Sequence, residues 1–469
     1  MQNQPKPKSI FLSDILLLNR LFEKTDRVFA CAPNDFGCAH PTMLVFDPEG
    51  RMVRNARKSV KQLKDLEVLK SAMVGGQIIF SLASEPILEQ LRDYPYYLLV
   101  DFAKARVKTP LYRQRFLWFH NPDGTMRSFT PSRNPYPSFL NLYNGSGIRG
   151  WLYRSFYRWS YRLGLKYWAA AGSFNVYASG DWPMSELGFE AADHQYSVFT
   201  GTAGENRKLI LERSEQGHTT HFLKFPISRK SKALVKNEAR VLQDMATQSW
   251  SHWQLPKVCR RQQALLLNNI RPANSVVMAI DLQPAHFKAF RELYRNEQYG
   301  VQQVAIGQLE AFHFVGSQLG LLHGLDFSET PLDRNRVHQL AMCIDQLFHH
   351  IDTVRPVPVA LSHGDFTPWN QFVTRDCLYV YDWELSQNQM PILYDLFHYI
   401  FQSTTLIQQG EAEDILKKKE ALKNCHFVQQ LQREVDLDFD WHWQFYLMYT
   451  ASYYLPIYLR QSDLFEQAH

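Results

Sequence analysis

The most constraining feature of the sequence is the stretch Leu361–Leu385, in which a few polar residues stand among apolar ones. Asp365 and Asn370 lie five residues apart, and a later apolar run ends at Asp382. Hard cations such as Mg²⁺ bind carboxylate and amide oxygens, and a well-placed carboxylate can accept the proton of an alcohol. We therefore expect Asp365 to act as a general base and Asn370 and Asp382 to hold a metal ion.

The order of these residues favours phosphoryl transfer. A base in a loop, an amide, a short hairpin and an aspartate after a strand follow one another in the same order in protein kinases. In the form His363-Gly-Asp365-x-x-x-x-Asn370, followed by Asp382-x-Glu384, the stretch resembles the aminoglycoside phosphotransferase and choline kinase family. The resemblance implies that His363 braces the catalytic loop. It leaves the role of the second acid, Glu384, open.

Earlier residues fit the same interpretation. Lys224 lies in an apolar strand pattern, and Glu238 follows it within the helical run Lys232–Met245. Because a buried lysine needs a counter-charge, we expect the two to form the lysine–glutamate pair that positions the nucleotide phosphates in kinases. The alternative is a lysine on a solvated strand edge. Gly201 and Gly204 give only a partial glycine pattern for a loop around the phosphates.

The resemblance covers approximately residues 195–459 and implies a bilobal protein kinase-like fold of the α+β class. We expect a small lobe over 195–274 and a large lobe over 275–469. The resemblance further implies ATP or GTP as donor, Mg²⁺ as cofactor, and a small-molecule hydroxyl acceptor such as a sugar, an amino alcohol or an aminocyclitol. The competing interpretation is a degenerate kinase fold that serves as a nucleotide-binding scaffold. Against it, Lys224, Asp365, Asn370 and Asp382 are all present.

The front of the chain lies outside this resemblance. We expect a separate basic, aromatic-rich α+β domain over residues 1–171 and a connector over 172–194. Residues 1–190 contain 25 Lys and Arg against 16 Asp and Glu, whereas the remainder contains 26 against 30. This asymmetry indicates two parts with different tasks. A basic domain joined to a small-molecule kinase favours the synthesis of a cell-surface saccharide or a lipid-linked intermediate.

Residues 148–171 show an unusual helical pattern. Four cations recur every four residues and share one helical face, and four apolar residues follow the spacing of an opposite face. One interpretation is a solvated basic face over a buried apolar stripe. A second is an interfacial helix on an anionic membrane, and a third is a site for an anionic glycan or nucleic acid, although no nucleic-acid-binding module is visible. The cations are Arg154, Arg158, Arg162 and Lys166, and the apolar residues are Leu152, Phe156, Trp159 and Leu163.

Length and cysteine usage add further limits. A chain of 469 residues predicts two or three domains, and its six cysteines form no C-x-x-C pair, which favours a reducing cytoplasm. The first residues indicate an amphipathic helix instead of a signal peptide, and no window contains 18 uncharged apolar residues, as a membrane span would. We therefore expect a cytoplasmic protein that contacts the inner membrane face at most peripherally.

Overall fold

The computed structural model describes most of the chain after residue 106 and shorter stretches before it. The described residues are 10–11, 14–15, 17–18, 21, 43–49, 52–53, 62–73, 78–91, 94, 96, 98–103, 107–121, 124–142, 147–178, 195–201, 206–261, 263–272, 279–323 and 334–460. These residues form two compact units. The first contains residues 1–235 and 258–269, and the second contains residues 236–257 and 270–469.

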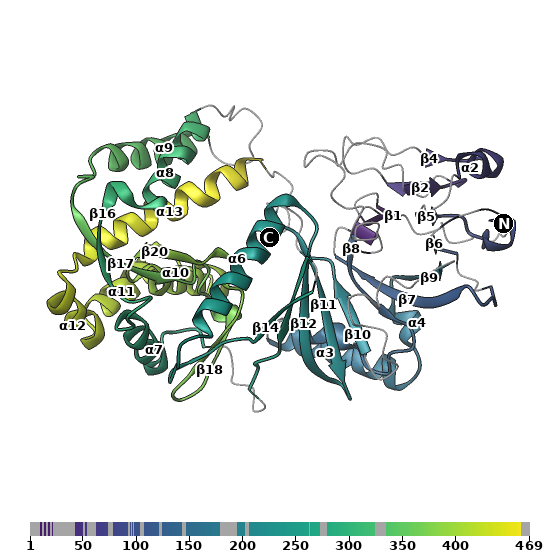
Figure 1. The fold of residues 1–469 in the computed structure, drawn as a ribbon, viewed down its shortest axis with the longest axis horizontal. Coiled ribbons are helices and arrows are strands. Elements are labelled where there is room, and N and C mark those ends of the chain that lie inside the picture. The colour runs from purple at the N-terminus through teal and green to yellow at the C-terminus, as the bar shows by residue number, and fades with distance from the viewer. Residues whose placement is uncertain are drawn as a thin grey trace. The chain divides into compact units, whose positions relative to one another are not determined.

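A single twelve-stranded sheet organises the first unit (Figure 1). Its order is β14-β15-β12-β11-β10-β8-β7-β9-β6-β5-β2-β4. The pairs β2–β4, β2–β5 and β5–β6 are parallel, and all other neighbours are antiparallel. The strands are β2 (Met43–Phe46), β4 (Gln62–Leu63), β5 (Ile78–Ser81), β6 (Leu98–Asp101), β7 (Tyr112–His120), β8 (Met126–Pro131), β9 (Gly172–Ala178), β10 (Gln195–Phe199), β11 (Lys208–Glu215), β12 (His218–Pro226), β14 (Val258–Arg261) and β15 (Ala264–Asn268).

The strand pair β8–β10 joins the front of the chain to the kinase-like part. Val198 pairs with Phe129, and Phe199 pairs with Ser128, in antiparallel register. Buried polar side chains reinforce the pairing: Asn134 Nδ2 donates to the Tyr196 carbonyl at 2.8 Å. The separate N-terminal domain expected from the sequence is therefore not confirmed, because the backbone hydrogen bonds of one sheet run without a break from one part into the other.

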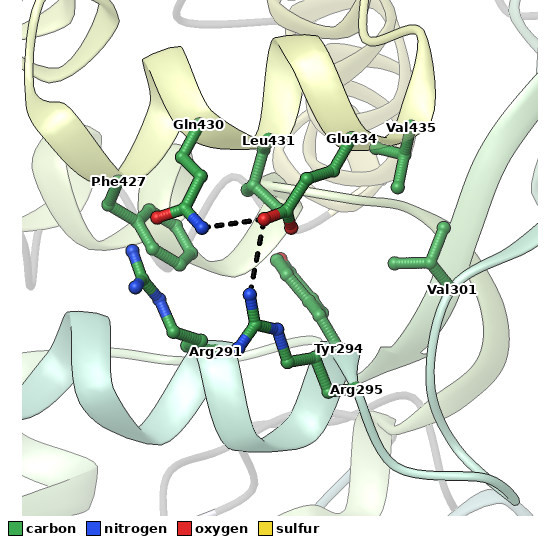
Figure 2. A pocket seen from close by; sticks show the side chains of 9 residues that line it. All are labelled: Arg291, Tyr294, Arg295, Val301, Phe427, Gln430, Leu431, Glu434 and Val435. Atoms are coloured by element: carbon green, nitrogen blue, oxygen red, sulfur yellow. Dashed lines mark hydrogen bonds and ion pairs between the residues drawn. The ribbon is translucent and has the colours of Figure 1, made fainter.

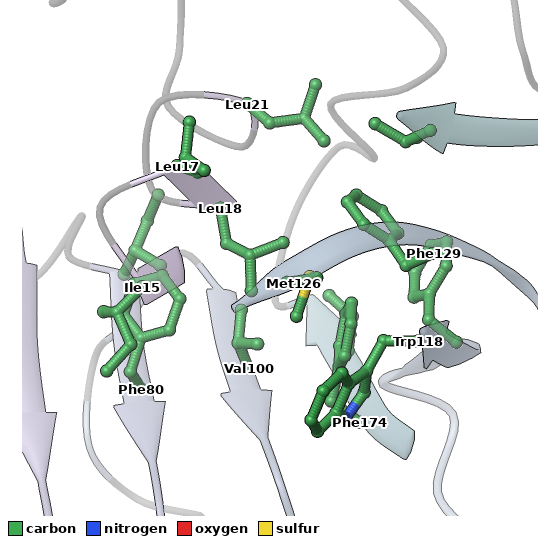
Figure 3. Packing of buried hydrophobic residues seen from close by; sticks show 14 of the residues in the cluster. Ile15, Leu17, Leu18, Leu21, Phe80, Val100, Trp118, Met126, Phe129 and Phe174 are labelled. Carbon is green, nitrogen blue, oxygen red and sulfur yellow. The ribbon is translucent and has the colours of Figure 1, made fainter. Parts of the chain in front are cut away.

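A shared apolar core lies along this sheet. It contains residues from the N-terminal segment, such as Ile15 and Leu18, together with strand residues such as Phe80, Trp118 and Phe174 (Figure 3). The same cluster extends to Leu211 and other residues of the kinase-like strands. Burial of this continuous apolar surface stabilises the front strands and the kinase-like strands together.

One sequence-based expectation for the front part needs correction. The range 172–194 was expected to be a connector, but its first residues form β9, which lies between β7 and β6 in the sheet. A Cβ on Gly172 would lie 2.5 Å from the Trp118 indole nitrogen, so only glycine fits this close approach. Gln62–Leu63 form strand β4, and helix α2 spans Leu66–Ala72 with Asp65 as its N-cap.

The predicted helix over residues 148–171 is present as two helices. Helix α3 spans Gly147–Arg162, and helix α4 spans Lys166–Ala169. Between them Gly164 adopts a left-handed backbone with φ of +73°, and the Leu165 N–H donates to the Ser160 carbonyl at 2.7 Å. A glycine in this conformation at the end of a helix is typical of a Schellman cap.

The remaining elements of the first unit are short. Strands β1 (Ile10–Phe11) and β3 (Met52–Val53) form a parallel pair. The 3₁₀ helices η2 and η3 span Leu88–Leu91 and Ser138–Leu142. Helix α6 (Arg229–Met245) begins in the first unit, and its residues from Lys236 onward belong to the second.

The second unit is mainly helical around two small sheets. One sheet has the order β16-β17-β20, and the other has the order β13-β19-β18. The strands are β13 (Trp253–Gln254), β16 (Gln302–Ala305), β17 (Pro356–Ser362), β18 (Gln371–Val373), β19 (Leu378–Val380) and β20 (Gln387–Pro391). The helices are α7 (Pro284–Tyr294), η4 (Ile306–Gln308), α8 (Glu310–His323), α9 (Arg334–His349), η5 (Pro368–Asn370), η6 (Trp383–Leu385), α10 (Tyr394–Gln402), the π-helix η7 (Ser403–Ile407), α11 (Ala412–Lys423), α12 (His426–Val435) and α13 (Phe439–Arg460).

The mixed helix and sheet composition predicted from the sequence is confirmed. The strand expected before Asp382 is present as β19. In the part of the chain that the structure describes, no helix combines the length and the apolar character needed to cross a membrane.

Candidate active site

The loop that carries Asp365 follows strand β17, and Asp395 holds its backbone. This aspartate lies in the first turn of helix α10 and is buried. Its carboxylate accepts hydrogen bonds from the His363 N–H at 2.8 Å, the Gly364 N–H at 3.0 Å and the Ser362 hydroxyl at 2.9 Å. Burial raises the pKa of Asp395, while these hydrogen bonds act in the opposite direction. Asp395 is thus the anchor of the loop.

Gly364 gives the loop its sharp turn. Its φ is +84°, in the left-handed region that favours glycine. A Cβ at this position would lie 2.2 Å from the Leu385 carbonyl oxygen. The glycine therefore lets the loop lie directly against the segment that contains Asp382 and Glu384.

His363 connects the same two segments through its imidazole ring, which is buried. The Asp365 N–H donates to His363 Nδ1 at 3.2 Å, so the ring proton resides on Nε2. Nε2 then donates to the Tyr381 carbonyl at 2.8 Å. Because Tyr381 directly precedes Asp382, this histidine joins the loop that carries Asp365 to the turn that carries Asp382.

Asp365 is held at both carboxylate oxygens. Asn370 Nδ2 donates to Oδ2 at 2.9 Å and to the Asp365 carbonyl at 3.0 Å. His398 Nε2 lies 3.2 Å from Oδ1, and its ring is buried. The Asp365 side chain itself remains about one third exposed, with a relative accessibility of 31%. The carboxylate is oriented from the interior and open on its outer side, as a base for an external alcohol must be.

His398 was not among the residues selected from the sequence. It lies on helix α10 three residues after Asp395, so the two side chains share a helical face. Tyr446 Oη lies 3.5 Å from His398 Nδ1 on the far side of the ring. The signal that could have identified it is the D-x-x-H pattern at the start of the helix that follows the catalytic motifs.

Asp382, Glu384 and Glu238 form a carboxylate cluster. One oxygen from each lies within 4.8 Å of the others. Asp382 has a left-handed backbone with φ of 65° and ψ of 46°, which is uncommon for a residue other than glycine. Asn237, the neighbour of Glu238 on helix α6, donates to the carbonyls of Glu384 and Ser386, both at 3.0 Å. These bonds hold the helix against the turn that carries the two other acids.

The cluster has the chemistry of a divalent-cation site. Three carboxylates this close repel one another, and Glu238 is fully buried. Hard divalent cations prefer such oxygen ligands. The donor set of Asp382, Glu384 and Glu238 therefore fits Mg²⁺, and the metal-binding role expected for Asp382 stays a prediction.

The remaining predicted residues belong to the first unit. Lys224 is buried in β12, where it pairs in register with Ile210 and Leu265. A position on a solvated strand edge is therefore excluded. Gly201 has a left-handed backbone with φ of +72°, while Gly204 lies outside the described residues. The pairing of Lys224 with Glu238 stays a prediction.

A cavity of about 90 Å³ lies elsewhere in the second unit, between helices α7 and α12 (Figure 2). An ion pair between Arg295 and Glu434, at 3.1 Å, spans it, and Gln430 donates to the same carboxylate at 2.6 Å. None of the predicted site residues lines it. The cavity is thus separate from the Asp365 loop.

Comparisons with known proteins give likeness in fold only. No family model matches the sequence, and no curated protein is significantly similar to it. Among solved structures, a choline/ethanolamine kinase family protein from Mesorhizobium loti is 17% identical, covering 59% of this chain and 92% of its own, with a TM-score of 0.30. An ADP-bound aminoglycoside phosphotransferase is 13% identical, covering 53% and 81%, with a TM-score of 0.35.

A third similar structure is a macrolide 2'-phosphotransferase from Brachybacterium faecium. It is 13% identical, covers 56% of this chain and 85% of its own, and has a TM-score of 0.35. At these identities and TM-scores the likeness assigns no activity, which has to rest on the residues of the site. The resemblance to aminoglycoside phosphotransferases and choline kinases that the sequence predicted is found again among these solved structures.

Proposed function

We propose that the protein is a phosphotransferase that moves the γ-phosphoryl group of ATP or GTP to a hydroxyl group of a small molecule. The observation that carries this proposal is a path of contacts from Asp365 through His363 to Tyr381. This path joins the partly exposed carboxylate of Asp365 to the acidic turn that begins at Asp382. Phosphoryl transfer needs these two groups side by side, a base for the alcohol and oxygen ligands for the cation on the phosphates.

In the proposed reaction, Asp365 orients the acceptor hydroxyl and takes its proton. The hydroxyl oxygen forms a bond to the γ-phosphorus, the bond from that phosphorus to the β–γ bridging oxygen breaks, and the nucleoside diphosphate leaves with that electron pair. Asn370 and Asp382 would hold Mg²⁺, joined by Glu384 and Glu238. When bound, the cation would neutralise charge on the phosphate oxygens. Lys224, with Glu238 as its partner, would contact the α- and β-phosphates.

The acceptor belongs to the class of sugars, amino alcohols and aminocyclitols. The basic front half of the chain supports a role in making a cell-surface saccharide or a lipid-linked intermediate. Such acceptors carry the free hydroxyl that Asp365 would deprotonate.

Calorimetric titration with ATP, with and without Mg²⁺, tests the proposal. Asp382→Ala should lose the Mg²⁺-dependent part of the affinity, because the phosphate charge is no longer compensated. Asp376→Ala is a matched control, since this aspartate lies in the neighbouring β18–β19 turn and pairs with the exposed Lys288. Equal ATP affinity in Asp382→Ala and in the unmodified protein would contradict the metal assignment. Nucleotide binding without any hydrolysis or transfer to a library of sugars and amino alcohols would instead indicate a scaffold.

A further inference from the structure

Helices α3 and α4 expose an unusual apolar surface, which we call the α3–α4 surface. Of the nineteen large hydrophobic side chains that are exposed among the described residues, eight lie within residues 151–168. The most exposed are Trp168 at 77%, Leu163 at 63% and Trp151 at 62%. The eight are Trp151, Leu152, Phe156, Trp159, Leu163, Leu165, Tyr167 and Trp168. Apolar patches of this kind mark binding surfaces in soluble proteins.

The position of this surface excludes one interpretation of the sequence. From the sequence, the apolar stripe that includes Phe156 and Trp159 could have been the buried face of the helix. The structure places the stripe in solvent and packs a different face, which carries Tyr153, Tyr157 and Tyr161, against the sheet. The interpretation of a buried apolar stripe under a basic face is therefore wrong.

The tyrosine face fixes helix α3 firmly. Tyr157 makes edge-to-face contacts with Phe119 of β7 and Phe139 of η3, with ring centroids 5.4 Å and 5.2 Å apart. Tyr161 is buried, and burial raises the pKa of its hydroxyl. The tyrosine face of helix α3 already packs against the sheet. The exposed apolar residues on its outer face are therefore not core residues that lack packing partners.

Helix α4 continues the same surface. The turn at Gly164 brings Trp168 back toward Phe156, with ring centroids 6.3 Å apart. Lys166 faces the protein, where its ammonium group donates to the Asn134 carbonyl at 3.1 Å. Of the four cations that the sequence placed on one face, Lys166 is thus engaged within the protein, while Arg158 and Arg162 are exposed.

The stretch of sequence that contains this surface carries charge of one sign. Residues 124–178 contain seven Lys and Arg and no Asp or Glu. The Arg162 guanidinium lies 6.0 Å from the centroid of the Trp159 ring, at the edge of the apolar residues. Tryptophan and tyrosine favour the boundary between headgroups and acyl chains, and arginine next to them can reach anionic headgroups.

We propose that the α3–α4 surface docks on an anionic lipid bilayer, with the aromatic side chains at the acyl boundary and Arg158 and Arg162 among the headgroups. A second copy of the chain is a poorer partner, because a symmetric interface would bring the same cations face to face. The docking is independent of the proposed phosphotransferase activity.

Vesicle co-sedimentation of the full chain tests the proposal. Binding should be absent with phosphatidylcholine alone, increase with the fraction of phosphatidylglycerol and decrease in high salt. Arg158→Glu with Arg162→Glu should weaken binding by at least about tenfold. Arg260→Glu with Arg261→Glu is a control of equal charge change, since both arginines are exposed on β14. Arg154 is left unchanged because it is only half exposed.

The apolar half of the surface is tested separately. Trp159→Ser with Trp168→Ser should abolish binding, whereas Leu340→Ser with Val354→Ser, two exposed apolar residues of the second unit, should not. Circular dichroism and thermal unfolding report that each variant is folded. Failure of the unmodified protein to bind anionic vesicles at low salt would overturn the proposal. So would a concentration-dependent dimer without lipid that the tryptophan variant abolishes, since the surface would then belong to a second copy.

Discussion

The ring of His398 and the carboxylate of Asp365 are in direct contact, with Nε2 3.2 Å from Oδ1. His398 lies on helix α10, and this helix also carries Asp395, which anchors the backbone of the Asp365 loop. One helix therefore fixes both the path of the loop and the orientation of its acid.

His398→Ala should reduce turnover with little change in nucleotide affinity. Without the histidine, Oδ1 of Asp365 loses its interior partner, and a misplacement of about 1 Å can cost up to about 10²-fold in rate. His398→Gln can still offer an N–H and should recover part of the loss. The measurement is kcat and KM for ATP turnover in each variant. Tyr446→Phe is the control, because it removes a hydroxyl that lies 3.5 Å from His398 and leaves the histidine itself in place. A loss confined to KM would show that His398 does not position the base.

Asp365→Asn should keep nucleotide binding and lose transfer. The acceptor hydroxyl no longer has a base, an effect of about 10²- to 10⁴-fold. Asn370 can still contact the substituted side chain, so the loop should retain its conformation. Rates of phosphate release and calorimetric ATP affinity, measured on the same sample, separate chemistry from binding. Transfer at the unmodified rate would remove Asp365 from the mechanism.

Gly364→Ala should disrupt the loop, whereas Gly320→Ala should not. The first substitution places a methyl group 2.2 Å from the Leu385 carbonyl and forces alanine into a left-handed backbone. Gly320 lies in helix α8 with nothing within 4 Å of the position that a Cβ would occupy, and alanine there should stabilise the helix by about 0.5–1 kcal/mol. Thermal unfolding and ATP turnover of both variants check this contrast. Full activity of Gly364→Ala would contradict the close approach of the two segments.

The second unit should lose stability as the pH falls from about 6.5 to about 4. Burial lowers the pKa of His286 and of His442 to about 4, whereas in the unfolded chain both titrate near 6.5. Between these values the unfolded chain binds more protons than the folded one, so the free energy of unfolding decreases as pH decreases. At pH of about 5 each histidine should cost about 2 kcal/mol relative to neutral pH.

Urea unfolding at neutral pH and near pH 5 measures this loss. His442→Gln removes one of the two titrating groups and keeps an N–H for the Asp438 carbonyl, which His442 Nδ1 contacts at 2.7 Å. The loss between the two pH values should then be about halved. An unchanged loss in this variant would mean that other groups control the acid sensitivity.

Part of the site was predictable because it is encoded in a short stretch. Asp365, Asn370 and Asp382 lie within eighteen residues, and a loop, a hairpin and a strand fix their geometry locally. His398 was missed because its contact with Asp365 depends on how helix α10 packs beneath the loop. Periodicity reveals a helix and its faces but not which loop the helix supports.

The face of helix α3 that packs against the sheet was likewise not predictable from the sequence. Its sequence offers two apolar faces, one with Phe156 and Trp159 and one with Tyr153, Tyr157 and Tyr161. Tyrosine is amphipathic and can serve a core or a surface, so the pattern alone could not tell which face packs. The contacts of Tyr157 with Phe119 and Phe139 decide it, and these partners lie in other elements.

The pairing of β8 with β10 has a consequence for any shortened form of this protein. A chain reduced to residues 195–469 would contain every predicted catalytic residue, yet it would leave the outer side of β10 without its neighbour. Val198, now fully buried, would lie on an open strand edge, which is a template for association with other chains. The front strands thus cover the strand edge that β10 would otherwise expose to other chains. We expect the shortened chain to aggregate, even though it retains the residues of the proposed active site.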